Sequence, residues 1–193
     1  MLITIEGIDG SGKTTLAQAL AEKFNFTYFR EPGATILGEK IREILLSVPM
    51  SPEAELLLFA TARAQFVIEK LRPALERGHV ILDRYIDSTI AYQGYGLGID
   101  RTFIQKLNTR IIDGLQPQLT ILLDLPIEIA MARTGNDRIE TRGKNFFELV
   151  RKGYLITAQA NPERFEILDG TLPPEKIFTE AICTIGRRLE VDV

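Results

Sequence analysis

An eight-residue run near the start of the chain carries the residue types that bind polyphosphates. It reads Gly7-Ile8-Asp9-Gly10-Ser11-Gly12-Lys13-Thr14 and follows the short apolar segment Leu2–Ile5. Its three glycines let the backbone curl so that several N–H groups point inward at phosphate oxygens. The Lys13 ammonium can then reach the outer phosphates, and the Thr14 hydroxyl can hold Mg²⁺. The run therefore predicts a P-loop, and with it a nucleotide-binding protein.

The residues after this run have the spacing of a helix, which strengthens the prediction. The segment Thr15-Leu16-Ala17-Gln18-Ala19-Leu20-Ala21 repeats small and apolar residues at helical intervals. A helix that begins here points the positive end of its dipole at the bound phosphates. A glycine-rich turn that fits the pattern by chance is the alternative, and the flanking strand and helix argue against it. We therefore expect every residue from Gly7 to Thr15 to contact the nucleotide, with Lys13 also taking part in catalysis.

Charged and turn-forming residues also follow the other apolar segments of the chain. Ligands of parallel α/β sheets bind beyond the carboxyl ends of the strands, so these residues are expected to gather at one edge. The apolar segments are Thr27–Phe29, Val80–Leu82, Leu119–Leu123 and Phe165–Leu168. The residues that follow them are, in the same order, Arg30-Glu31-Pro32-Gly33, Asp83-Arg84-Tyr85, Asp124-Leu125-Pro126 and Asp169-Gly170-Thr171.

Helical patterns separate these apolar segments. Alternation of strands and helices predicts an α/β fold of the P-loop NTPase type, with a doubly wound, five-stranded parallel sheet and helices on both faces. The length of 193 residues suits a single domain, residues 1–193. The expected helices are one after the P-loop that ends near Phe24-Asn25, followed by Ile36–Leu46, Pro52–Arg77, Arg101–Gly114, Pro126–Arg133, Phe146–Ala160 and Pro174–Leu189.

Composition excludes several classes of protein. The formal net charge of −3 argues against general nucleic-acid binding. One cysteine, Cys183, rules out an internal disulfide, and one histidine, His79, makes a histidine-based metal site or catalytic triad improbable. No apolar stretch of membrane-spanning length and no signal peptide is apparent, which predicts a cytoplasmic protein without membrane contact.

Further motifs resemble those of one family of small kinases. Downstream of the P-loop the chain lacks the D-x-x-G and N-K-x-D motifs of GTPases, and it is much shorter than ABC-type ATPases. Thymidylate kinases carry R-E-P-G-G-T, D-R before an aromatic residue or histidine, S-x-x-A-Y-Q-G, and an arginine-bearing lid. The corresponding residues here are Arg30-Glu31-Pro32-Gly33-Ala34-Thr35, Asp83-Arg84-Tyr85, Ser88-Thr89-Ile90-Ala91-Tyr92-Gln93-Gly94 and the segment from Arg133 to Glu140.

This resemblance implies transfer of the γ-phosphate of ATP to dTMP, giving dTDP and ADP. The acceptor is a phosphate oxygen, largely ionised at pH 7 because its second pKa is about 6, so no general base is needed. The site must instead hold two polyanions in line and neutralise their charge. We expect Arg84 between the two phosphates, Arg30 on the acceptor phosphate, and Asp83 with Thr14 on Mg²⁺. A structural ion pair between Asp83 and Arg84 is the alternative for that motif.

The resemblance also assigns residues to the base and the sugar of dTMP. Phe59 and Arg63 are four residues apart and share one face of a helix. Spacing alone favours Phe59 as a core residue, whereas the resemblance implies that its ring stacks on thymine and that Arg63 hydrogen-bonds the base. It further implies that Tyr92 packs under the deoxyribose. The remaining substrate-binding residues implied are Asp9, at the sugar 3′-hydroxyl or its neighbouring arginine, with Ser88, Thr89 and Gln93.

The P-loop itself lacks an arginine, because Gly10 and Ser11 stand where one branch of the family places a cation. The missing charge is therefore expected from the lid, about residues 133–144, with Arg133 the first candidate and Arg138 the second. Glycine and asparagine in this segment favour a lid that closes over ATP. Ala34 replaces the second glycine of R-E-P-G-G-T, which puts a Cβ where the backbone of relatives needs unusual dihedral angles.

Two other functions remain open from the sequence. A deoxynucleoside kinase needs a base for its hydroxyl acceptor, and Glu31 stands where such enzymes place one. A nucleotide-binding regulatory module would bind ATP without phosphate transfer, although the predicted acceptor-site arginines argue against it. The resemblance also implies a homodimer, for which the apolar faces of Pro52–Arg77 and Arg101–Gly114 are the candidate interface.

Overall fold

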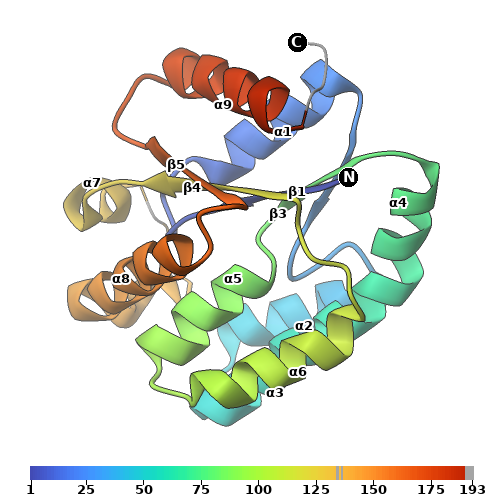
Figure 1. Ribbon diagram of the computed structural model, residues 1–193. Coiled ribbons are helices and arrows are strands. Elements are labelled where there is room, and N and C mark those ends of the chain that lie inside the picture. The colour runs from blue at the N-terminus through green and yellow to red at the C-terminus, as the bar shows by residue number, and fades with distance from the viewer. Residues whose placement is uncertain (134, 136, 190–193) are drawn as a thin grey trace.

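The computed structural model describes residues 1–133, 135 and 137–189, and a parallel sheet lies at its centre (Figure 1). Thr134 and Asn136, which belong to the expected lid, lie outside the described residues. The sheet has five strands in the order β2-β3-β1-β4-β5, and every adjacent pair is parallel. This confirms the doubly wound fold expected from the sequence. The strands are β1 Leu2–Glu6, β2 Thr27–Arg30, β3 Val80–Asp83, β4 Leu119–Asp124 and β5 Phe165–Asp169.

Each strand extends one residue beyond the apolar segment from which it was expected. The additional residue is charged in every case, so each strand ends in an ionisable side chain at the carboxyl edge of the sheet. Parallel pairing aligns Arg30 with Asp83, and Asp83 in turn with Ile5, which brings the ends of β2, β3 and β1 together. The expected clustering of charges at the carboxyl edge is therefore confirmed. The five strand-ending residues are Glu6, Arg30, Asp83, Asp124 and Asp169.

Helices cover both faces of the sheet (Figure 1). One of the two main apolar clusters lies under α1 (Lys13–Phe24) and α9 (Pro174–Leu189). Ile3, Ile5 and Ile121 from the sheet are fully buried against these two helices. The other face carries most of the remaining helices. They are α2 Ile36–Ser47, α3 Pro52–Phe66, α4 Arg72–Arg77, α5 Ile86–Thr89, α6 Arg101–Ile112 and α8 Lys144–Ala160, while the short α7 Ile127–Met131 follows β4.

The long helix expected over Pro52–Arg77 is helical throughout but changes its winding in the middle. A π-helical turn at Val67–Leu71 joins α3 to α4, and the Arg72 N–H donates to the Val67 carbonyl, five residues back. Pro73 follows directly; it has no N–H to donate, and its ring would clash with the carbonyl four residues earlier in an α-helix. The wider turn accommodates this proline without ending the helix.

A second π-helical segment was not among the helices expected from the sequence. It spans Ile90–Gly96 and continues α5, so that Ile86 to Gly96 form one helical unit. This unit packs closely on α8, and Gly96 allows the approach because a Cβ there would lie 2.6 Å from the ring of Phe146. The segment carries most of the S-x-x-A-Y-Q-G motif and points it at the carboxyl edge of the sheet.

The described part of the expected lid contains one short 3₁₀ turn, Glu140–Arg142. Asp137 caps this turn, since its Oδ1 accepts from the backbone N–H groups of Ile139 and Glu140 at 2.8 and 2.9 Å. Over the described residues, no helix combines the length and the apolar character required to cross a membrane.

Candidate active site

The P-loop between β1 and α1 adopts the curled conformation expected from its glycines. Gly10 and Gly12 have φ values of 78° and 88°, in the left-handed region that favours glycine. A Cβ on Gly10 would also overlap the carbonyl oxygen of Ala130 in α7. The backbone and its neighbour thus explain why this chain has no side chain, and so no arginine, at position 10.

Lys13 is buried at the start of α1 and lies over the loop. Its Nζ donates to the Ile8 carbonyl at 3.2 Å and lies 3.7 Å from the Asp9 carboxylate. Burial and the nearby Arg84 lower the pKa of Lys13, although Asp9 and Asp83 oppose that shift. A buried lysine held only by a carbonyl and a distant carboxylate is suited to an incoming anion.

Thr14 and Asp83 lie together at the entrance of the loop. The Thr14 hydroxyl donates to Asp83 Oδ2 at 2.5 Å, whereas Asp83 Oδ1 is buried and has no hydrogen-bond partner among the described residues. Mg²⁺ prefers hard oxygen ligands and commonly binds one or two carboxylates together with substrate phosphates. A hydroxyl and a carboxylate with one orphaned buried oxygen therefore fit the expected Mg²⁺ site. Asp83 does not form the alternative ion pair with Arg84, whose carboxylate partner is Asp9.

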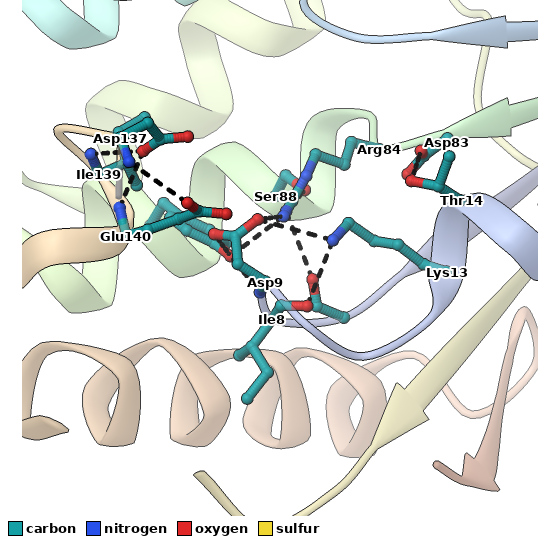
Figure 2. A network of polar contacts seen from close by, with 12 residues as sticks. Ile8, Asp9, Lys13, Thr14, Asp83, Arg84, Ser88, Asp137, Ile139 and Glu140 are labelled. Carbon is teal, nitrogen blue, oxygen red and sulfur yellow. Dashed lines mark hydrogen bonds and ion pairs between the residues drawn. The ribbon is translucent and has the colours of Figure 1, made fainter. Parts of the chain in front are cut away.

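Arg84 occupies the centre of the polar network, as Figure 2 shows. Its NH2 group makes a short ion pair with Asp9 Oδ1 and donates to the Tyr92 hydroxyl at 3.2 Å. Its NH1 group donates to the Gly7 carbonyl at 3.3 Å and to Ser88 Oγ at 3.2 Å. The backbone of Arg84 is in the left-handed region, with φ of 69°, a strained conformation that is typical of functional positions.

The Asp9 carboxylate is held in its ionised form by its neighbours. Burial opposes its ionisation, but Arg84, Lys13 and the Tyr92 hydroxyl outweigh burial and lower the pKa of Asp9 to about 2. Asp9 thus links the P-loop lysine to Arg84 and to the helix that carries Tyr92.

Glu6 lies beneath this network and was not among the site residues expected from the sequence. Its carboxylate accepts hydrogen bonds from the Tyr85 N–H at 2.7 Å, from Ser88 Oγ at 2.6 Å and from the Tyr154 hydroxyl at 2.9 Å. Burial, and then the charge of Asp87, raise the pKa of Glu6 to about 7. Its position as the last residue of β1, directly before the P-loop, was the signal that could have identified it.

A cavity opens beside Arg84 and is lined by Asp9 of the P-loop and by Phe59 of α3. Its lining mixes the aromatic ring of Phe59 with polar groups, which is the composition of a small-molecule site. The residues expected from the sequence that line it are Asp9, Phe59, Arg63, Arg84, Ser88, Thr89, Tyr92 and Gln93.

Arg63 forms the floor of this cavity, and its charge is fully compensated. Its Nε donates to Glu31 Oε2 at 2.7 Å, and its NH1 donates to Thr89 Oγ1 at 2.8 Å and to Asn108 Oδ1 at 3.1 Å. Its NH2 donates to the Tyr85 carbonyl at 3.0 Å. Only 2% of Arg63 is exposed, so these contacts hold the guanidinium in one position.

Arg42 of α2 lines the cavity, whereas Arg30, which was expected there, does not. Arg30 lies 3.8 Å from Glu39 and its side chain is 40% exposed. Burial, together with the nearby charges of Arg30 and Arg84, lowers the pKa of Arg42. Three guanidinium groups within electrostatic range of one another favour an anion between them. In the sequence, Arg42 could have been identified as a site residue because it is a basic residue in an amphipathic helix, seven positions after Thr35.

The lid arginines separate into two groups. Arg138 donates through NH2 to Glu55 Oε2 at 2.6 Å and through Nε to the carbonyl of Leu45, which lines the first cavity. Its distance to this carbonyl is 2.8 Å. Arg133 instead lines a second cavity with P-loop residues, between α1 and the start of α9. The structure therefore brings Arg133, and not Arg138, next to the P-loop. The P-loop and α1 residues of this second cavity are Ser11, Gly12, Thr15, Leu16 and Ala19, and residues 170–178 close it.

Comparison with known proteins finds relatives that match nearly the whole chain. The family model described as thymidylate kinase matches residues 5–181. The chain belongs to the thymidylate kinase family. Thymidylate kinase from Carboxydothermus hydrogenoformans is 48% identical over 191 residues, covering 92% of this chain and 93% of its own. That from Desulfovibrio desulfuricans is 42% identical over 205 residues, covering 96% of this chain and 94% of its own.

A solved structure of the thymidylate kinase family shares the fold. The crystal structure of thymidylate kinase from Ehrlichia chaffeensis superposes with a TM-score of 0.80 at 36% identity, covering 96% of this chain and 98% of that one. Membership of this family makes the chain a nucleoside monophosphate kinase that uses ATP.

Proposed function

We propose that this protein transfers the γ-phosphate of ATP to dTMP, giving dTDP and ADP. The observation that carries the proposal is the position of Arg84. It lies between the P-loop and the cavity that holds Phe59 and Arg63, where a donor and an acceptor phosphate would meet. A guanidinium at that point can neutralise charge that develops on the transferred phosphoryl group.

The residues around Arg84 bind the donor phosphates, the acceptor phosphate and the metal ion in this proposal. Lys13 and the P-loop N–H groups hold the donor phosphates, while Arg42 and Arg84 hold the acceptor phosphate. Thr14 and Asp83 would hold Mg²⁺, which when bound neutralises the charge of the donor phosphates. Because the acceptor is already an anion, none of these residues has to remove a proton.

The base and sugar of dTMP occupy the rest of the acceptor cavity in this proposal. Phe59 is half-buried and lines the cavity, so its ring is available to stack on thymine. Arg63 and Thr89 approach the polar edge of the base. Tyr92 lies under the deoxyribose, where its ring would disfavour a 2′-hydroxyl.

Glu31, which a deoxynucleoside kinase would need as a base, is held by Arg63 in this protein. Its Oε2 is bound to Arg63 Nε at 2.7 Å, and the side chain is 4% exposed. Burial raises the pKa of Glu31 even though Arg63 opposes the shift. We therefore assign Glu31 the role of holding Arg63 under the base.

For the lid, we propose that Arg133 supplies the cation that the P-loop lacks. It lines the cavity next to Ser11 and Gly12, which would hold the ATP side of the site. The catalytic role predicted for Arg138 remains the second candidate. Arg133→Ala should reduce kcat at saturating dTMP and ATP far more than Arg138→Ala; the reverse order would exchange their roles.

We also propose that the protein is a homodimer through the α3–α6 face. Leu57 of α3, Ile68 of the following π turn and Phe103 of α6 are 52%, 72% and 49% exposed. Large exposed apolar side chains on adjacent helices favour an interface with a second copy. Sedimentation equilibrium of the wild type and of Phe103→Asp should show a dimer and a monomer, respectively.

The acceptor specificity tests the proposed reaction. With ATP and Mg²⁺, ADP formation measured against dTMP, dUMP and thymidine should be highest for dTMP. Thymine differs from uracil by one methyl group, worth about 1–3 kcal/mol in a pocket, so weaker turnover of dUMP is expected. Turnover of thymidine without turnover of dTMP would make the protein a nucleoside kinase.

A further inference from the structure

Glu55 of α3 is a buried carboxylate that contacts the acceptor site and the lid at once. Its Oε1 accepts from Gln93 Nε2 at 2.9 Å and from Arg142 NH1 at 3.1 Å. Its Oε2 accepts from Arg138 NH2 at 2.6 Å and makes a shorter contact with Arg142 NH2. Only 1% of the Glu55 residue is exposed. Its partners therefore include an amide that lines the acceptor cavity and two cations from the 137–142 segment.

The charge of Glu55 fixes the direction of the Gln93 amide. Burial opposes ionisation of Glu55, but hydrogen bonds from Arg142, Arg138 and Gln93 outweigh it and lower the pKa of Glu55. An ionised carboxylate can only accept hydrogen bonds, so the amide nitrogen of Gln93, and not its oxygen, must face Glu55. The Nε2 and Oε1 atoms diverge from one carbon. Gln93 Oε1 is thus turned away from Glu55 and remains an acceptor for the cavity that Gln93 lines.

Thr89 supplies the complementary group in the same cavity. Its Oγ1 accepts from Arg63 NH1 at 2.8 Å, which leaves the hydroxyl proton available to donate. Thr89 and Gln93 lie four residues apart in one helical unit and line the same cavity. A donor from Thr89 and an acceptor from Gln93 match a ligand that has a carbonyl oxygen next to an N–H. The imide edge of thymine and uracil has this order at O4 and N3–H. Cytosine has an amino group and an unprotonated N3 at the same positions, which reverses both.

We propose that Glu55 is a positioning residue that fixes the Gln93 amide so that the acceptor cavity selects pyrimidines with an N3–H over cytosine. The inference rests on the proposed function, because it places the base of a nucleoside monophosphate in this cavity. Arg138 and Arg142 hold Glu55 from the other side, so base selection is strongest when these two lid arginines are in place.

Kinetics with two acceptors test this role directly. The ratio of kcat/KM for dTMP to that for dCMP should fall about tenfold in Glu55→Met, which removes the acceptor for Gln93 Nε2 and frees the amide to turn. Glu53→Met, which removes an exposed carboxylate on the same helix, should leave the ratio unchanged. In a Gln93→Met background, adding Glu55→Met should cause no further fall.

The results distinguish this role from a structural one and from failure of the proposed function. An unchanged dTMP to dCMP ratio in Glu55→Met would overturn the positioning role even if stability or total activity fell. Absence of dTMP turnover in the wild type would overturn both the function and the inference.

Nuclear magnetic resonance of the wild type gives a test that does not depend on a folded variant. One side-chain amide proton of Gln93, assigned by its loss in Gln93→Met, should be protected from solvent exchange and stay protected when dTMP binds. Exchange of both Gln93 amide protons at the rate of an exposed glutamine would contradict a fixed amide.

Discussion

Tyr92 and Asp9 are joined by two hydrogen bonds that connect the π-helical segment Ile90–Gly96 to the P-loop. The Tyr92 hydroxyl donates to Asp9 Oδ2 at 2.8 Å and accepts from the Asp9 N–H at 3.1 Å. The same hydroxyl accepts from Arg84 NH2 at 3.2 Å. A residue that would lie under the sugar of the acceptor therefore also holds the central arginine and the loop that binds the donor.

Tyr92→Phe separates these two roles of the tyrosine. It keeps the ring but removes the hydroxyl, so we expect kcat to fall about tenfold, since a lost hydrogen bond costs about 1–1.5 kcal/mol. The preference for dUMP over UMP should remain, because the ring still fills the space of a 2′-hydroxyl. Tyr92→Ala should lose that preference as well. An equal dUMP to UMP ratio in wild type, Tyr92→Phe and Tyr92→Ala would exclude the steric role.

Removal of the Arg84 guanidinium should affect the chemical step. In Arg84→Ala we expect kcat to fall about a thousandfold, because a cation that acts on developing phosphoryl charge is absent. Circular dichroism should show a folded protein. Arg77→Ala, an exposed arginine at the end of α4, serves as the control and should retain full activity. Wild-type turnover in Arg84→Ala would remove Arg84 from the catalytic residues.

Asp83→Asn should alter the dependence on Mg²⁺. The amide keeps an oxygen for Thr14 but lowers the charge at the orphaned Oδ1, so the metal concentration that gives half-maximal activity should rise about tenfold. Isothermal titration with ATP in the absence of metal should show little change in affinity. If the Mg²⁺ dependence of activity is the same as in the wild type, Asp83 does not hold the ion.

Glu6 should make stability depend on pH near neutrality. Its pKa is about 7 in the folded protein and 4.5 ordinarily, so the native state binds more protons than the unfolded state between these values. Its contribution to stability is complete below pH 4.5 and is lost as the pH rises toward 7, where the buried carboxyl must ionise.

Glu6→Gln cannot ionise, so its Tm relative to the wild type should rise between pH 5 and pH 8. Thermal denaturation of both proteins at these two pH values measures the change. A Tm difference that is constant, or that moves in favour of the wild type as the pH rises, would contradict a pKa of about 7 for Glu6 in the folded protein.

The fold could be predicted because each buried strand is a short apolar run and each helix shows apolar spacing. The strand ends were missed by one residue because a charged side chain at the carboxyl edge keeps strand pairing without being apolar. The π-helical unit through Ile90–Gly96 was missed for a different reason. Glycines and alternating aromatics obscure its period, and its winding is set by packing on α8.

The sequence also predicted an unusual backbone conformation at position 34, where alanine replaces the second glycine of the R-E-P-G-G-T motif. Ala34 has φ of 62°, so this chain places a Cβ in a conformation that favours glycine. Its N–H donates to Glu39 Oε1 at 2.9 Å, which helps to hold the loop in this conformation.

Site residues that lie within one short motif could be predicted from the sequence. Site residues that are recognised by contacts between distant segments could not. Lys13, Thr14, Asp83 and Arg84 lie in short motifs whose spacing is informative. The contact of Glu55 with Arg138, 83 residues away, exists only in the folded chain. Arg42 and Glu6 likewise become recognisable once the cavity and the carboxyl edge of the sheet are known.

Phosphate transfer between two named molecules is the most direct test of this account. ATP labelled with ³²P at the γ position is incubated with the protein, Mg²⁺ and dTMP, and the nucleotides are separated by chromatography. We expect the label to move into dTDP, in an amount equal to the ADP formed, and to do so negligibly with Arg84→Ala. Release of the label as free phosphate, or its transfer to thymidine but not to dTMP, would contradict the proposed reaction.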